Sequence, residues 1–118
     1  MFSYQTLEVY KKAFAQNRKI YSFLKHNRSI ARYLKDQLGR SSLSIMLNIA
    51  EGSGKFSEKD RRSFFVIARG SAFECAAIVE FLRAEEEISE ELKNELVGGF
   101  EEVSKILFVM IRNLSEKK

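Results

Sequence analysis

The chain has 118 residues, which is the length of a single domain, and contains no proline or tryptophan. Hydrophobic residues make up 45% of it and charged residues 31%, a composition that is typical of a helical domain and too apolar for a disordered chain. Its short apolar runs, its start without a signal-peptide pattern and its single cysteine predict a cytoplasmic protein with no membrane span and no internal disulfide. The net charge of +4 divides into +8 for residues 1–62 and −4 for residues 63–118, which predicts one basic and one acidic surface.

Helical periodicity predicts a first helix over residues 7–24, with Thr6 as its cap. Gln16 belongs to its expected polar face, together with Lys12 and Lys19. The expected buried stripe comprises Leu7, Val9, Tyr10, Ala13, Phe14, Ile20, Tyr21 and Leu24.

A second helix is predicted over residues 30–51, after a cap at Asn27 or Ser29. Its expected buried stripe comprises Ile30, Tyr33, Leu34, Leu38, Ile45 and Ile49. The helix should stop at Gly52, because glycine enters the left-handed conformation that ends helices at little cost. The Gly54-Lys55 pair that follows has no glycine five residues earlier and follows a helix, so it is a hairpin turn and not a phosphate-binding loop.

A third helix is predicted over residues 58–83, with Ser57 as its cap and Asp60 close to completing a capping box. Ser89 is expected to begin a fourth helix that reaches Leu114. Its Gly98-Gly99 pair marks either a weak point or a close packing contact. Short connections make neighbouring helices antiparallel, so the prediction is an all-α, up-down-up-down four-helix bundle in one domain, residues 1–118.

Small side chains are concentrated on the second and third predicted helices, which should therefore approach each other closely. They are Ser41, Ser42 and Ser44 on one helix, and Ala68, Gly70, Ser71, Ala72, Cys75 and Ala76 on the other. Cys75 is interpreted as a small buried hydrophobic residue within this seam.

An enzyme is not expected, because the residues that carry catalysis or bind metals are missing from the sequence. Di-iron bundles use Glu-x-x-His pairs on two helices, and zinc sites and catalytic triads also require histidines or clustered ligands. His26 is the only histidine and falls in a predicted connection. No catalytic residue, metal site or cofactor is therefore predicted.

Basic residues suggest a nucleic-acid partner. Lys55, Lys59, Arg62 and Arg69 recur at helical spacing on one face at the start of the third predicted helix. Four more accompany the second helix: Arg28, Arg32, Lys35 and Arg40. Such cations bind the phosphate backbone of RNA or DNA with little sequence preference. A solvated basic face that only keeps the protein soluble explains the same pattern equally well.

The third predicted helix also has more apolar surface than a monomeric bundle can bury. Its main stripe is Phe64, Ile67, Ala68, Ser71, Cys75, Ile78 and Leu82. A second set lies on roughly the opposite side: Val66, Phe73, Ala77 and Phe81. Because a second stripe would expose aromatic surface to water, we expect it to form the interface of a homo-oligomer.

The stretch 44–74, SIMLNIAEGSGKFSEKDRRSFFVIARGSAFE, resembles the core of the bacterial four-helix-bundle family of proteins encoded within intervening sequences of 23S ribosomal RNA genes. The marks are residues 48–52 (NIAEG), a hydroxyl-capped helix, residues 67–71 (IARGS) and Glu74. The family usually has proline and a small polar residue before the first mark, whereas this chain has Met46-Leu47. The resemblance implies a ring, often of five subunits, and no catalytic residues. Related members are accessory proteins of diversity-generating retroelements, which implies a reverse transcriptase and nucleic acid as partners.

Overall fold

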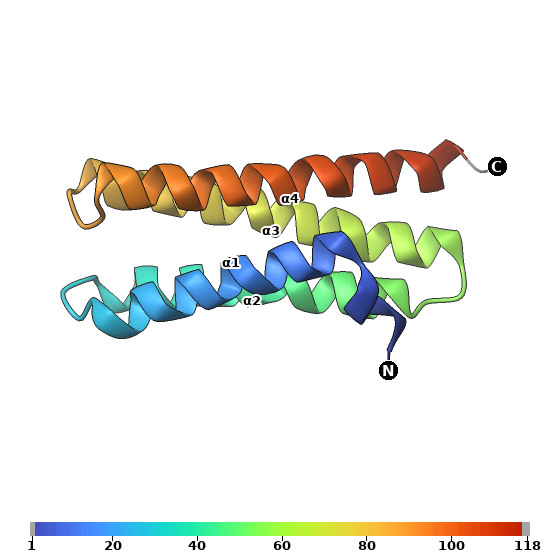
Figure 1. Ribbon diagram of the computed structural model, residues 1–118, viewed down its shortest axis with the longest axis horizontal. Coiled ribbons are helices and arrows are strands. Elements are labelled where there is room, and N and C mark those ends of the chain that lie inside the picture. Colours follow the sequence, from blue (N-terminus) through green and yellow to red (C-terminus); the bar gives the residue numbers. More distant parts are fainter. Residues whose placement is uncertain (1, 117–118) are drawn as a thin grey trace.

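The computed structural model describes residues 2–116, so residues 1, 117 and 118 of the predicted domain lie outside it. The described residues contain no strand. They form a short 3-10 helix and four long α-helices, namely η1 (Ser3–Thr6), α1 (Glu8–His26), α2 (Arg32–Ser53), α3 (Glu58–Ala84) and α4 (Glu90–Glu116). The predicted all-α, antiparallel four-helix bundle is confirmed (Figure 1).

The bundle is elongated, with a longest dimension of 48 Å, and each helix packs against two neighbours in the order α1, α2, α3, α4 and back to α1. Figure 1 shows α1 and α2 on one side of the molecule and α3 and α4 on the other. The α1–α2 and α3–α4 connections lie at one end. The α2–α3 connection lies at the opposite end, near the start of α1 and the end of α4.

Two of the predicted helix caps are confirmed. The Ser57 hydroxyl accepts a hydrogen bond from the backbone N–H of Asp60 (3.0 Å) at the start of α3. The Ser89 hydroxyl accepts one from the backbone N–H of Leu92 (3.0 Å) at the start of α4. Each bond satisfies a backbone donor that the first turn of a helix leaves without an intrahelical partner.

The other predicted caps are wrong. Thr6 lies in η1, where its hydroxyl donates to the Ser3 carbonyl, and α1 begins after Leu7 without a side-chain cap. The α2 helix likewise begins after Ala31 rather than after Asn27 or Ser29. The Asn27 amide instead donates to the carbonyl of Phe23 at the end of α1 (2.7 Å). A polar residue near a helix start can bond to the preceding element, and sequence spacing does not distinguish the two cases.

Gly52 does not end α2 in the left-handed conformation that the sequence predicts. The helix continues to Ser53, Gly54 follows at φ −90° in the right-handed region, and no described glycine has a positive φ. Gly52 instead lies buried against α3, where an added Cβ would be 2.8 Å from Cβ of Phe64 and 2.9 Å from Cε1 of Phe65. This glycine is therefore required by close helix packing and not by a turn.

The seam between α2 and α3 is closely packed, as its small residues predict. Ser41 and Ser42 are buried, and the Ser44 and Ser71 hydroxyls lie 3.0 Å apart across the seam. Cys75 is fully buried, and burial raises the pKa of its thiol to about 12, with a smaller contribution from the Glu74 carboxylate. The thiol therefore stays protonated at neutral pH and is not an activated nucleophile.

The core contains side chains from all four helices, with the largest contribution of fully buried residues from α3 and α4. Gln16, predicted on the polar face of α1, is only 4% exposed, so that prediction is wrong. Its amide nitrogen donates to the backbone carbonyl of Leu96 (2.9 Å), which satisfies the polar group inside the core. The amide occupies the space that a Cβ on Gly99 would fill.

Several aromatic residues assigned to buried stripes point into solvent instead. Phe14 is 45% exposed, Tyr21 66% and Tyr33 69%. Each lies at the edge of its apolar stripe, where helical periodicity alone does not decide between the core and the surface.

The two adjacent glycines of α4 should respond oppositely to alanine. An added Cβ at Gly98 meets nothing within 4 Å, so Gly98→Ala should raise the free energy of unfolding by about 0.5–1 kcal/mol through helix propensity. The same change at Gly99 would displace the buried Gln16 amide from the Leu96 carbonyl, and the loss of this hydrogen bond should lower the free energy of unfolding. Denaturant unfolding of both variants measures the difference, and equal effects would contradict the packing described here.

Candidate interaction surfaces

The eight basic residues predicted to bind nucleic acid do not form one continuous surface. Arg28, Arg32 and Lys35 lie at the end of the molecule that holds the α1–α2 connection (Figure 1). Lys55, Lys59 and Arg62 lie at the opposite end, around the α2–α3 connection; Arg40 and Arg69 lie between the two groups. We call the first three the α1–α2 cluster and the second three the α2–α3 cluster.

The α1–α2 cluster surrounds a shallow hollow of about 410 Å³, which Ile30 and Asp36 also line. Within residues 2–116, none of the three cations lies within ion-pair distance of a carboxylate. Their charges are therefore exposed to solvent and available to an anionic ligand.

Two of the three side chains in the α2–α3 cluster contact other residues of the same subunit. Lys55 lies in the connection between α2 and α3, as the predicted hairpin turn implies. Its ammonium is 3.8 Å from the Glu51 carboxylate and 5.1 Å from the centre of the Phe64 ring. Arg62 donates from Nε to the Ser115 hydroxyl at the end of α4. Both side chains are thus partly engaged within the subunit.

Arg69 occupies a distinct environment between two aromatic rings. Its guanidinium carbon lies 4.7 Å from the centre of the Phe73 ring and 5.3 Å from that of Phe108, and its Nε donates to the Ser104 carbonyl (3.3 Å). Attraction between a cation and aromatic faces holds this side chain along the α3–α4 boundary. The Glu74 carboxylate, farther along α3, accepts a hydrogen bond from the Gln37 amide.

All four residues predicted at an oligomer interface are exposed. Val66 is 43% exposed, Phe73 56% and Phe81 46%, and Ala77 is exposed as well. The predicted core stripe of α3 is partly wrong, because Ile67 is 51% exposed. The buried residues of α3 are Phe65, Ala68, Ala72, Cys75, Val79 and Leu82, a stripe rotated away from the prediction.

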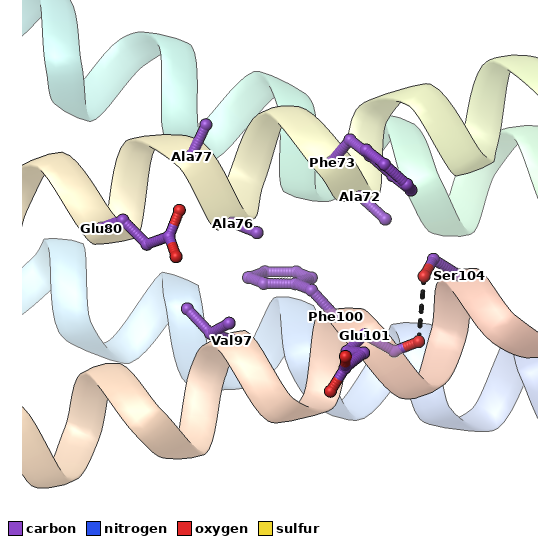
Figure 2. Close-up of a pocket in the computed structure, with 9 residues that line it drawn as sticks. All are labelled: Ala72, Phe73, Ala76, Ala77, Glu80, Val97, Phe100, Glu101 and Ser104. Atoms are coloured by element: carbon purple, nitrogen blue, oxygen red, sulfur yellow. Dashed lines mark hydrogen bonds between the residues drawn. The ribbon is translucent and has the colours of Figure 1, made fainter.

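A groove runs along the boundary between α3 and α4 and consists of two depressions that share Phe73. The first has a volume of about 390 Å³; its apolar lining includes Phe100 and Ala76, and Glu80 and Glu101 lie at its rims (Figure 2). The second has a volume of about 490 Å³ and is lined by Arg62, Val66, Arg69, Gly70, Phe73, Phe108 and Ile111. Two predicted nucleic-acid residues and three predicted interface residues therefore share one groove.

Sequence reasoning missed the contribution of α4 to this groove. Phe108 is 48% exposed and Val109 42% exposed. Phe108 directly follows Leu107 of the predicted apolar face, so it lies about 100° away from that face on the helix. The rule that identified Phe73, an aromatic residue off the core stripe, would also have identified Phe108.

Within the part of the chain that the structure describes, no group of three or more His, Cys, Asp or Glu side chains is placed to hold a metal ion. No helix in residues 2–116 is long and apolar enough to cross a membrane.

Comparisons with known proteins agree with the fold and with the resemblance of residues 44–74. The family model described as the 23S rRNA-intervening sequence protein matches residues 5–109. A crystal structure of a protein of unknown function from the S23 ribosomal protein family of Bacteroides thetaiotaomicron is 27% identical, with a TM-score of 0.81. The match covers 87% of this chain and 97% of that one. A search of curated proteins found no match. The chain belongs to the 23S rRNA-intervening sequence protein family.

Proposed function

We propose that this protein is a non-enzymatic homo-oligomer that binds the phosphate backbone of RNA or DNA through its basic residues. One observation carries the nucleic-acid part of this proposal. Of the eight basic residues predicted as contacts, only Lys55 forms an ion pair among the described residues. Seven cations without a carboxylate partner keep their attraction for phosphate, whereas paired cations would have to exchange one anion for another.

The oligomeric part of the proposal rests on the α3–α4 groove. Its exposed phenylalanines and arginines, with no lysine in its lining, match the composition of protein interfaces. The family resemblance suggests a ring of five. A ring would also repeat each basic cluster around its axis and so raise the avidity for a long polyanion.

A second candidate is a purely structural oligomer, for example a scaffold for a reverse transcriptase, without a nucleic-acid role of its own. The observation that favours it is Arg69, whose guanidinium is already held between Phe73 and Phe108. An arginine between aromatic side chains is typical of the energetic centre of a protein–protein contact.

Binding to a fluorescent single-stranded oligonucleotide should separate these candidates. Nucleic-acid binding predicts that affinity falls steeply between about 50 and 200 mM salt. Arg28→Gln/Arg32→Gln/Lys35→Gln should weaken binding and reduce the slope of log K against log salt by about 2, because each lost phosphate contact on a single strand removes about 0.7. Lys55→Gln/Lys59→Gln/Arg62→Gln should have a smaller effect, because two of these side chains have partners within the subunit.

The matched control is Lys12→Gln/Lys19→Gln/Lys93→Gln, which removes the same charge from three lysines that are ion-paired with glutamates. It should leave the salt slope nearly unchanged. An affinity that does not depend on salt, or no binding at low salt, would refute the nucleic-acid proposal and favour the structural oligomer. Equal effects of the control and the α1–α2 variant would refute the assignment of the contacts.

A further inference from the structure

The first depression of the α3–α4 groove, which Glu80 and Glu101 border, has the features of a docking site for a cationic side chain. Its apolar lining includes the ring of Phe100 and Ala76, and the Glu80 and Glu101 carboxylates lie on opposite helices at its rims (Figure 2). Neither carboxylate has an ion-pair partner among residues 2–116. A side chain with an apolar stem and a positive end would satisfy both the lining and the rims.

The outer face of α1 presents a ridge of this kind. Phe14, Arg18 and Tyr21 follow at positions i, i+4 and i+7, and therefore share one side of the helix. Phe14 is 45% exposed and Tyr21 66%, and Arg18 is exposed without an ion-pair partner in the described part of the chain. Within the subunit, the Phe14 ring lies 6.1 Å from that of Tyr10 and the Lys25 ammonium lies 5.9 Å from the centre of the Tyr21 ring, and both aromatic side chains still keep exposed surface.

The ridge and the groove lie at the same height along the bundle. Two ion pairs fix the register of α1 against α4, namely Lys12–Glu102 (3.3 Å) and Lys19–Glu95 (3.0 Å). Residues 12–19 of α1, which include Phe14 and Arg18, therefore lie level with residues 95–102 of α4, which include three of the four α4 residues in the first depression, namely Val97, Phe100 and Glu101. In a closed ring whose axis runs along the helices, neighbours are related by rotation alone, so only surfaces of equal height meet.

The charge distribution favours contact between these two different surfaces. Residues 1–53, which contain α1 and α2, have nine basic and three acidic residues, a net charge of +6. Residues 70–116, which contain most of α3 and all of α4, have four basic and eleven acidic residues, a net charge of −7. A head-to-tail contact brings opposite charges together, whereas α1–α2 against α1–α2 would repel.

We propose that the α3–α4 groove of one subunit receives the α1 ridge of a second copy of this chain, with Arg18 between Glu80 and Glu101 and with Phe14 and Tyr21 against the neighbouring apolar surface. This inference rests on the proposed homo-oligomer and specifies its two faces. The contact is heterologous, so it extends around a ring and does not end at a dimer.

Charge reversal on the full-length protein tests this contact, with mass measured by analytical ultracentrifugation. Arg18→Glu should raise the concentration at which the assembly half-dissociates by on the order of 100-fold, because like charges would face each other. Glu80→Arg/Glu101→Arg should do the same. The combined variant, Arg18→Glu/Glu80→Arg/Glu101→Arg, should regain the assembly, because the charges are complementary again.

Arg40→Glu is the matched control, because it makes the same charge change outside both the ridge and the groove. Arg40 is exposed on α2 and has no ion-pair partner among residues 2–116. This variant should not alter the mass. An oligomer that resists Arg18→Glu would overturn the ridge assignment and leave the proposed function intact. If only Glu80→Arg/Glu101→Arg dissociated it, the groove would face something other than the ridge. A monomeric wild type would overturn both proposals.

Discussion

Gly52→Ala is expected to lower the free energy of unfolding by about 1–3 kcal/mol, because the added methyl group overpacks the α2–α3 seam. Its Cβ would lie 2.8 Å from Cβ of Phe64, an atom fixed by the backbone of α3, and 2.9 Å from the Phe65 ring. The collision can be relieved only by moving one helix relative to the other. Urea unfolding followed by circular dichroism measures the loss.

Gly54→Ala is the control for this change. An added Cβ at Gly54 meets only the Glu51 carbonyl oxygen at 3.6 Å, an ordinary van der Waals distance, and the residue already has a negative φ. Its free energy of unfolding should therefore change by less than about 0.5 kcal/mol. Equal losses at both glycines would show that the connection, and not the helix seam, is sensitive.

Phe73→Asp is expected to dissociate the assembly while most of the helix content remains. Phe73 is 56% exposed in the subunit and lies where the two depressions of the groove meet. The subunit therefore loses little on substitution, whereas the assembly loses the burial of an aromatic ring, worth roughly 1.5–3 kcal/mol, at every interface.

Phe56→Asp provides a matched comparison, because Phe56 is fully exposed in the α2–α3 connection and lines neither depression. It should leave the mass unchanged. An oligomer unaffected by Phe73→Asp would show that assembly uses another surface. Circular dichroism of both variants verifies that the bundle remains folded.

Most of the fold could be predicted from the sequence because its signals are local. Four segments with helical periodicity, separated by short connections, predict an antiparallel bundle. The Ser57 and Ser89 caps identify the starts of two of its helices. Thr6 and Asn27 have the same chemistry as these caps, but their side chains bond to other backbone groups. Cap chemistry therefore predicts that a helix begins nearby and not which residue caps it.

The errors on the helix faces have a common origin in packing partners that lie far apart in sequence. Gln16 is buried because Gly99, more than 80 residues later, leaves room for its amide beside the Leu96 carbonyl. Apolar residues on two sides of α3 allow more than one rotation, and packing buries Phe65 while it exposes Ile67. Periodicity within one helix contains no information on either choice.

The candidate surfaces were predictable only in part. The position of Phe73 off the predicted core stripe of α3 was enough to predict that it lies outside the core, and its exposure is confirmed. The groove itself depends on α4, which supplies Phe108 and Glu101 beside the residues of α3. The basic residues fall into clusters at opposite ends because α2 spans the length of the bundle. Arg28, Arg32 and Lys35 lie at or before its start, whereas Lys55, Lys59 and Arg62 follow its end.

Light scattering coupled to size-exclusion chromatography tests the central claim, self-association through the exposed α3–α4 face, most directly. At micromolar concentration the wild-type protein should have a mass several times that of the 13.7 kDa chain, and about five times that value for a ring of five subunits. The mass should not change on dilution within this range, because a closed ring gains an interface for every subunit. A mass near 13.7 kDa would contradict the account, because the exposed face would then have no partner among copies of this chain.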